Sequence, residues 1–198
     1  MRRSETDTRE TVLQAAMNTF ASHGFSGASI RDIAAAAGVT KPTVYYHFGS
    51  KADLYQALVD LAFDRMHALM SDAAESEGPA RRRLERLLAS VFAFTRAERD
   101  LVRIAFVTPY AAAEELPDNI ACTSKHVRNV ELLHTIMEQG QRSGELAPYS
   151  PRVLVSAVYG QMMNSIMGYL VGVQEPPDDA LAEEVVRLFM DGAAATAH

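Results

Sequence analysis

The chain has 198 residues, a formal net charge of −6 and one cysteine. Hydrophobic residues make up 48% of the chain and charged residues 22%, so the chain can bury a core and is not typical of a disordered protein. The single cysteine, Cys122, excludes a disulfide within the chain and any zinc site built on cysteines.

The sequence also lacks the patterns of a membrane or secreted protein. A transmembrane helix needs about 20 mostly apolar residues. The longest apolar stretch, residues 153–173, is interrupted by Ser156, Gln161, Asn164 and Ser165. The first ten residues have no apolar core of the kind found in signal peptides. We therefore expect a cytoplasmic protein, in a reducing compartment, with no membrane partner.

Apolar residues recur with a helical period along almost the whole chain. Near the N-terminus, Leu13, Ala16 and Phe20 share one helix face, and Gly24 is placed to end that helix. Farther on, Val127, Leu133 and Met137 are expected to face inwards together. No alternating run typical of a strand exceeds a few residues. Besides two short helices within residues 29–48, helices are predicted at about residues 6–23, 50–73, 80–96, 101–107, 119–141, 151–173 and 178–194.

The two short helices have clear local signals. Ser29 is a typical N-cap for the first of them, and Gly38 ends it. Thr40 can cap the second, whose first turn holds Pro42, where a missing N–H is harmless. Two helices joined by a glycine-bearing turn predict a helix-turn-helix, which places its second helix in the major groove of DNA.

The exposed face of the second short helix suits DNA chemically. Val44 and Phe48, four residues apart, are expected to face inwards. The remaining face then offers hydroxyls, a lysine and a histidine, from Thr40, Lys41, Thr43, Tyr45, Tyr46 and His47. Charge supports this placement weakly: residues 1–51 carry six basic and four acidic side chains, whereas the rest carries 13 and 21.

This segment resembles the DNA-binding domain of the tetracycline-repressor (TetR) family of bacterial transcription regulators. The resemblance covers about residues 9–55 and is carried by many identities at fixed spacing. They are Ser29-Ile30-Arg31-Asp32-Ile33-Ala34, Ala37-Gly38-Val39-Thr40-Lys41, Thr43-Val44-Tyr45-Tyr46-His47-Phe48, Ser50-Lys51 and Leu54, with Phe20, Gly24 and Phe25 also in register. The rest of the chain resembles the family only in outline.

The resemblance implies an all-α fold with two domains. Residues 1–50 would form a three-helix, helix-turn-helix DNA-binding domain, and residues 51–198 a six-helix ligand-binding and dimerisation domain. The family's third helix reads the major groove, which implies that role for Lys41, Pro42, Thr43 and Tyr45. Positions matching Tyr46, His47 and Lys51 commonly contact phosphates. Arg31 matches a position that reaches a base or a phosphate. At the position of Pro42 the family commonly has a small residue. Because proline has no backbone N–H, Pro42 cannot donate a backbone hydrogen bond at this position.

The C-terminal residues predict a homodimer. Small residues step by four along residues 151–173, forming a ridge that a second helix can approach closely. A close crossing within one chain would explain the same pattern. In the family, the last two helices form the dimer interface as a four-helix bundle. The expected contacts are Ser156, Gly160, Asn164 and Gly168 on one helix and Leu181, Val185, Leu188 and Phe189 on the other.

The resemblance also implies a cavity for a small-molecule effector. Methionine and aromatic side chains suit a bulky apolar or aromatic ligand. The candidate walls are Phe63, Met66, Phe92, Phe106, Tyr110, His134, Met137, Met163 and Met167. His134 and Glu138 are four residues apart, but no metal-binding motif surrounds them, so neither a metal nor a cofactor is predicted.

Together these features predict a homodimeric regulator, a repressor rather than an enzyme. It would bind a palindromic operator in double-stranded DNA and be released by a small molecule. Two alternatives stay open. The first is an activator or a regulator without a small ligand. The second is an enzyme built on a helical bundle, against which the sequence shows no nucleophile elbow, P-loop or dinucleotide fingerprint.

Overall fold

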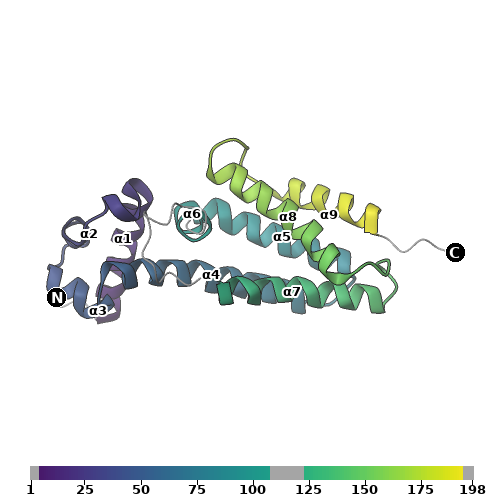
Figure 1. Cartoon of the computed structure of the whole chain (residues 1–198), viewed down its shortest axis with the longest axis horizontal. Coiled ribbons are helices and arrows are strands. Elements are labelled where there is room, and N and C mark those ends of the chain that lie inside the picture. The colour runs from purple at the N-terminus through teal and green to yellow at the C-terminus, as the bar shows by residue number, and fades with distance from the viewer. Residues whose placement is uncertain (1–4, 108–122, 194–198) are drawn as a thin grey trace. The chain divides into compact units, whose positions relative to one another are not determined.

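The computed structural model describes residues 5–107 and 123–193. Within these ranges the chain is all-α, with nine helices and no strand, which confirms the predicted fold class. The helices, labelled in Figure 1, are α1 (Glu5–Gly27), α2 (Ile30–Ala37), α3 (Lys41–Phe48), α4 (Lys51–Glu75), α5 (Ala80–Ala97), α6 (Arg99–Val107), α7 (Thr123–Arg142), α8 (Pro151–Leu170) and α9 (Asp179–Ala193).

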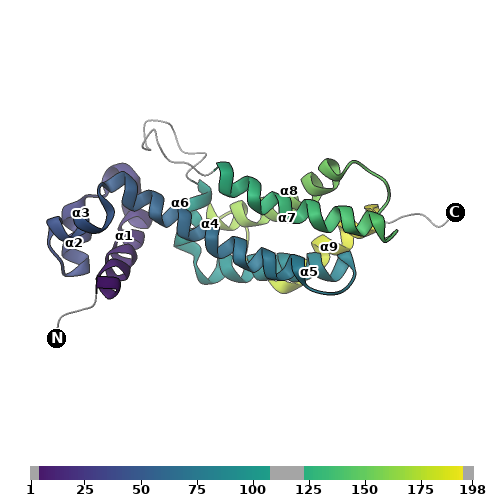
Figure 2. The same ribbon diagram turned by 90° about the horizontal axis from the view of Figure 1, so that it is seen from below.

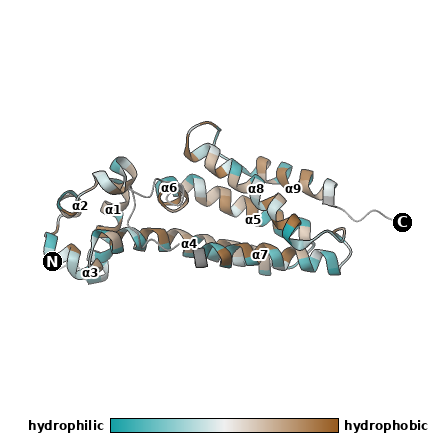
Figure 3. Ribbon diagram, viewed as in Figure 1, coloured by the Kyte–Doolittle hydropathy of each residue, from teal (hydrophilic) through white to brown (hydrophobic). Residues whose placement is uncertain are grey.

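The described residues fall into two compact units. The first contains residues 5–63 and 100–107, and the second contains residues 64–99 and 123–193. Helix α4 contributes its first half to the first unit and its second half to the other. Along α4 and α5, hydrophobic and hydrophilic residues alternate every turn or two, as expected of helices with one buried face (Figure 3).

In the first unit, Gly24 ends the regular part of α1. Its φ of 69° and ψ of 177° interrupt the helical backbone, a conformation that glycine adopts without steric cost. The chain then folds Phe25 back onto the helix, where its ring stacks on that of Phe20 with centroids 6.0 Å apart. Tyr55 of α4 meets both rings edge-on, at 5.0 and 5.2 Å. This aromatic cluster holds α1 against α4.

Local capping shapes α2 and α3 as the sequence predicts. Ser29 accepts a hydrogen bond from the backbone N–H of Asp32 (3.2 Å), and Gly38 ends α2 with a left-handed φ of 66°. Thr40 accepts from the N–H of Thr43 (3.4 Å), and Pro42 lies in the first turn of α3. Helices α2 and α3 therefore form the expected helix-turn-helix, packed against α1 (Figure 1).

In the second unit, α5 packs against α7, α8 and α9, and α7 and α8 lie side by side (Figure 2). Gly140 of α7 is needed at a close crossing, because a Cβ there would lie 2.8 Å from Leu146 Cδ1 and 3.0 Å from Ala80 Cβ. The same junction completes the start of α5. Pro79 offers no side-chain cap, and the Glu145 carboxylate instead accepts from the Ala80 N–H at 2.7 Å.

Polar contacts join α4 to α7 within this unit. The carboxylate of Asp64 accepts from Lys125 (2.9 Å) and Arg128 (2.9 Å). Partial burial acts to raise the pKa of Asp64, but these hydrogen bonds and positive charges hold it below its ordinary value. Deeper in, His67 Nδ1 lies 2.9 Å from Asn129 Oδ1. The Asn129 side-chain nitrogen is buried without an acceptor among the described residues.

Two details differ from the sequence-based expectations. Helix α8 ends at Leu170 rather than near residue 173, because Gly172 adopts a φ of 79° and the N–H groups of Val173 and Gln174 turn back to the Gly168 carbonyl. Val127, expected to face inwards, is exposed. It stands near the start of α7, where the inward face contains Leu133, Ile136 and Met137 instead.

Within the described ranges, no helix is both long and apolar enough to cross a membrane. The same residues contain no group of three or more histidine, cysteine or acidic side chains arranged to hold a metal ion.

Candidate nucleic-acid interface

Helix α3 buries one face and exposes the other, as the sequence predicts. Val44 and Phe48 are buried within the first unit. Tyr45 and Tyr46 are 48% and 75% exposed, and Lys41 and Pro42 are exposed beside them. The side chains expected to meet a major groove therefore stand on the open side of a helix whose opposite side is fixed by packing.

The two threonines at the start of α3 are bonded to each other. Thr40 Oγ1 and Thr43 Oγ1 lie 2.8 Å apart, so one hydroxyl donates to the other. Thr40 also caps the helix. Whichever hydroxyl donates within the pair, the other keeps its own O–H for an outside acceptor, and the Thr43 oxygen keeps a free lone pair. The pair can therefore meet a base edge without losing its structural role.

Arg31 and Lys51 lie on the helices before and after α3. Arg31 of α2 is exposed, and its Nε lies 3.5 Å from Asp32, an exposed pair of the kind that contributes little to stability. Lys51, at the start of α4, places its Nζ 4.4 Å from the centre of the Phe25 ring. Partial burial there lowers the pKa of Lys51 from its usual value. The aromatic cluster thereby positions one predicted phosphate contact.

His47 and Tyr46 occupy the C-terminal half of α3. Their rings meet edge-on with centroids 5.2 Å apart, and the His47 ring lies 6.3 Å from that of Phe48. The Tyr46 hydroxyl donates to Glu5 Oε1 at 3.0 Å, which raises the pKa of Tyr46 above its ordinary value. Tyr46 is thus held by a residue 41 positions away.

Two residues beside α3 were not singled out from the sequence. The exposed Arg9 guanidinium lies over the Phe48 ring, 5.0 Å from its centre, and adds a cation beside α3. Glu5 contacts Tyr46 one helical turn earlier. Only the four-residue spacing of Glu5 and Arg9 places them on one face of α1, and no local pattern shows that this face meets α3.

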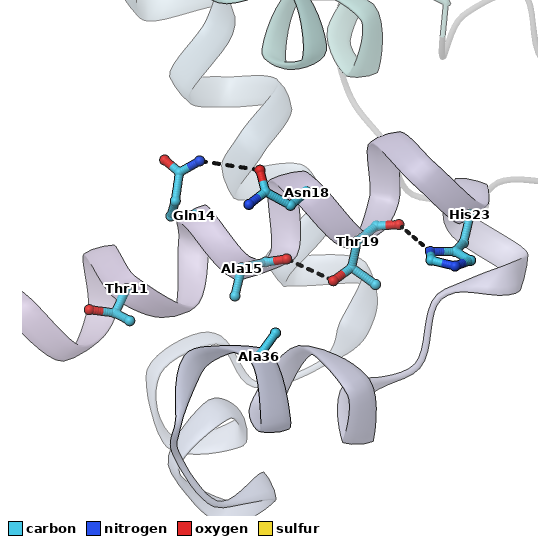
Figure 4. A pocket seen from close by; sticks show the side chains of 7 residues that line it. All are labelled: Thr11, Gln14, Ala15, Asn18, Thr19, His23 and Ala36. Atoms are coloured by element: carbon cyan, nitrogen blue, oxygen red, sulfur yellow. Dashed lines mark hydrogen bonds between the residues drawn. The ribbon is translucent and has the colours of Figure 1, made fainter.

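A hollow of about 470 Å³, most of whose lining residues have polar side chains, lies between α1 and α2 (Figure 4). Within it, Gln14 donates to Asn18 (3.3 Å), and the Thr19 hydroxyl donates to the Ala15 carbonyl (2.7 Å). Its lining residues are Thr11, Gln14, Ala15, Asn18, Thr19, His23 and Ala36. None of them belongs to the predicted DNA-contact set.

The residues predicted for a dimer interface fall into three groups by burial. Gly168, Val185 and Phe189 are buried within their own chain, and a Cβ on Gly168 would lie 2.4 Å from the Gln174 side chain. Leu181 is half-buried, and the exposed members are Ser156, Gly160, Asn164 and Leu188. Beside them, an apolar groove of about 320 Å³ runs between α8 and α9, lined by Tyr149, Val153, Leu154, Ala157, Gln161, Leu188, Phe189 and Gly192.

The predicted ligand-binding residues also fall into groups. In the first unit, the rings of Phe63 and Phe106 meet at 5.4 Å. In the second, Met66, Phe92 and Met137 are buried, and the half-buried members are His134, Met163 and Met167. Tyr110 lies outside the described residues. The contact between half-buried His67 and buried Asn129 is a polar feature of the second unit that no sequence pattern identified.

Comparisons with known proteins match this geometry. Residues 12–58, which include α2 and α3, match the family described as bacterial regulatory proteins, tetR family. The HTH-type transcriptional regulator TtgR of Pseudomonas putida is 39% identical over 71 residues, which is 36% of this chain and 33% of that protein. The chain therefore spans about a third of the length of the first such relatives.

Two other relatives align along nearly the whole chain. The HTH-type transcriptional regulator YdgC of Bacillus subtilis is 26% identical over 197 residues, covering 97% of this chain and 95% of that protein. The crystal structure of FadR from Bacillus subtilis, in complex with stearoyl-CoA, shares the fold with a TM-score of 0.80 at 20% identity, covering 92% and 98% of the two chains. Together, the matched helix-turn-helix and these relatives point to the TetR family of bacterial transcription regulators.

Proposed function

We propose that this chain is a homodimeric repressor that binds a palindromic operator through α3 and is released by a small apolar or aromatic molecule. The observation that carries DNA binding is the exposed face of α3, with its hydroxyls and Lys41, inside the matched residues 12–58. Lys51, Arg31 and Arg9 place cations on the neighbouring helices. Such cations position a protein on phosphates, while side chains in the groove read the bases.

Dimerisation is supported by the apolar groove between α8 and α9. Val153 and Leu188 are 58% and 64% exposed and line the same apolar groove, and contiguous exposed apolar surface marks an interaction site. A second copy of α8 and α9 is the covering surface proposed here. A two-fold dimer would present two α3 helices to half-sites about 34–36 Å apart, or a multiple of that spacing.

An enzyme on the same fold is the main alternative. Relatives such as TtgR are transcriptional regulators by name, which favours DNA binding over catalysis. An activator is a second alternative, since repression depends on where the operator lies and not on the protein's contacts.

The proposed DNA contacts divide into two classes that mutation can separate. Lys51→Ala is expected to weaken binding to every duplex and to lower the slope of log affinity against log salt by about one unit. Thr43→Ala and Tyr45→Ala are expected to reduce the preference for operator over mixed-sequence DNA by about fivefold or more, because contacts with base edges carry the sequence information. Fluorescence anisotropy over a range of salt concentrations measures both, with an operator selected from a random-sequence pool.

Arg82→Ala is the matched control, since it removes an exposed cation from α5, outside the proposed interface. It should change neither quantity. An equal loss on both DNAs for all three interface variants would contradict the division into positioning and reading contacts.

The small-molecule proposal rests on the methionine and aromatic residues of the second unit, which suit an apolar ligand. A ligand releases DNA only by binding the released state more tightly than the DNA-bound state. Operator DNA must then weaken ligand binding by the same factor. We expect this reciprocity for any apolar or aromatic compound that raises the melting temperature in a thermal-shift screen.

Met163→Trp is expected to abolish the ligand's effect and to leave operator binding intact, because Met163 is half-buried and far in sequence from α3. Isothermal titration of the ligand with and without operator measures the coupling. Equal affinity in the two titrations would rule out release by that ligand.

A further inference from the structure

The start of α1 places an acidic side chain against the proposed DNA-reading helix. Glu5 Oε1 accepts a hydrogen bond from the Tyr46 hydroxyl at 3.0 Å, and both side chains are exposed. One turn later, Arg9 lies over the Phe48 ring. The first two turns of α1 therefore place one negative and one positive side chain against α3.

The hydrogen bond to Glu5 uses the only proton that Tyr46 can donate. A tyrosine hydroxyl has one O–H, and phosphate oxygens are acceptors only. Tyr46 cannot donate to Glu5 and to a DNA phosphate at the same time.

We propose that Glu5 is a gating residue that lowers the affinity of this protein for DNA of any sequence by holding the Tyr46 hydroxyl. Binding to DNA then requires the Glu5–Tyr46 hydrogen bond to break. Because the competing partner is a phosphate, which carries no sequence information, the gate weakens operator and mixed-sequence DNA by the same factor. This inference rests on the proposed DNA-binding function and adds to it a residue that opposes binding.

Arg9 gives the gate a counterpart on the same face of α1. Its guanidinium is exposed over Phe48 and can accompany a phosphate that reaches Tyr46. Glu5 and Arg9 are four residues apart, so a freed Glu5 carboxylate remains within one helical turn of a cation. Once a DNA phosphate accepts the hydrogen bond from the Tyr46 hydroxyl, the Glu5 carboxylate can therefore pair with Arg9.

The test compares two substitutions with identical changes in net charge. Glu5→Gln removes the charge beside Tyr46 and leaves a neutral amide oxygen, which is a weaker acceptor for the Tyr46 hydroxyl. Glu10→Gln removes a charge from another exposed position of the same helix, five residues on and about 140° around its axis. Affinity for a mixed-sequence duplex of about 30 base pairs is measured by fluorescence anisotropy at low salt, where phosphate contacts dominate. This duplex requires no knowledge of the operator.

Glu5→Gln is expected to tighten binding at least about threefold more than Glu10→Gln does, on both mixed-sequence and selected operator DNA. In a Tyr46→Phe background, which lacks the hydroxyl, the difference between the two glutamine variants should vanish. Circular dichroism checks that each exposed substitution leaves the fold unchanged.

Equal effects of Glu5→Gln and Glu10→Gln on DNA affinity would overturn the gate. Weaker DNA binding by the Glu5→Gln variant would also overturn it, because Glu5 would then orient Tyr46 for DNA. A difference that persists in the Tyr46→Phe background would also contradict it, because the effect would then not pass through the hydroxyl. A different result would contradict the proposed function itself. If the unmodified protein binds neither duplex, it is not a DNA-binding regulator, whatever the effect of Glu5.

Discussion

Leu188→Glu is expected to convert the protein from a dimer to a monomer at micromolar concentration. Leu188 is 64% exposed on α9 and lines the apolar groove with Tyr149 and Val153. Burying one leucine contributes about 1.5–3 kcal/mol, and a two-fold interface contains each residue twice. Losing both leucines and burying two carboxylates should raise the dimer dissociation constant at least about 100-fold. Sedimentation equilibrium measures the change.

The monomer should also lose its preference for a palindromic operator, because two linked α3 helices bind two half-sites together. Arg187→Gln is the matched control. It changes the net charge by the same amount at the neighbouring exposed position, where Arg187 pairs only loosely with Glu184 at 3.5 Å. A Leu188→Glu protein that remains dimeric would mean that the groove between α8 and α9 is not the interface. Phe189 is a poorer test, since it is buried in its own chain and its loss would disturb folding.

Arg83→Ala is expected to lower the free energy of unfolding of the second unit by about 3 kcal/mol. Arg83 is 8% exposed, and its guanidinium donates to the carbonyl of Ala74, at the end of α4, and to the side chain of Gln139 on α7. Burial lowers the pKa of Arg83, and the charge of Glu145 partly offsets that effect. Removing the side chain leaves two acceptors without their donor and opens a cavity where three helices meet.

Such a loss corresponds to a fall in melting temperature of about 6–12 °C for a chain of this size. Differential scanning calorimetry measures it. Arg82→Ala, at the exposed neighbouring position, should shift the melting temperature by no more than about 1–2 °C, because exposed substitutions stay within about 0.5 kcal/mol. If the two variants melt together, the buried guanidinium does not hold α4 and α7 to α5.

The helix-turn-helix could be predicted from the sequence because its signals are local. Ser29 and Thr40 cap helices within three residues of themselves, and Gly38 adopts the left-handed backbone that ends α2. The four-residue spacing of Val44 and Phe48 decides which face of α3 is buried. Each signal depends on the backbone within one or two turns, so the identity of the residues suffices.

At the edges of the apolar helix faces, packing between helices decides which residues are buried. Leu188 and Phe189 were both expected in a dimer interface, yet they stand 100° apart on α9, and only Phe189 is buried within the chain. Val127 shares the helical period of Leu133 and Met137 but is exposed. Periodicity shows that an apolar stripe exists, whereas the neighbouring helices decide how wide it is and where it ends.

The sequence by itself determined the all-α fold, the capped helix-turn-helix and the residues on the open face of α3, because short-range hydrogen bonds and the helical period set these features. Only the tertiary structure decided what stands beside that face. Glu5 meets Tyr46 across 41 positions, and Glu145 caps α5 across 65. Contacts over such separations depend on how helices pack, and a single sequence carries no local pattern that reports them.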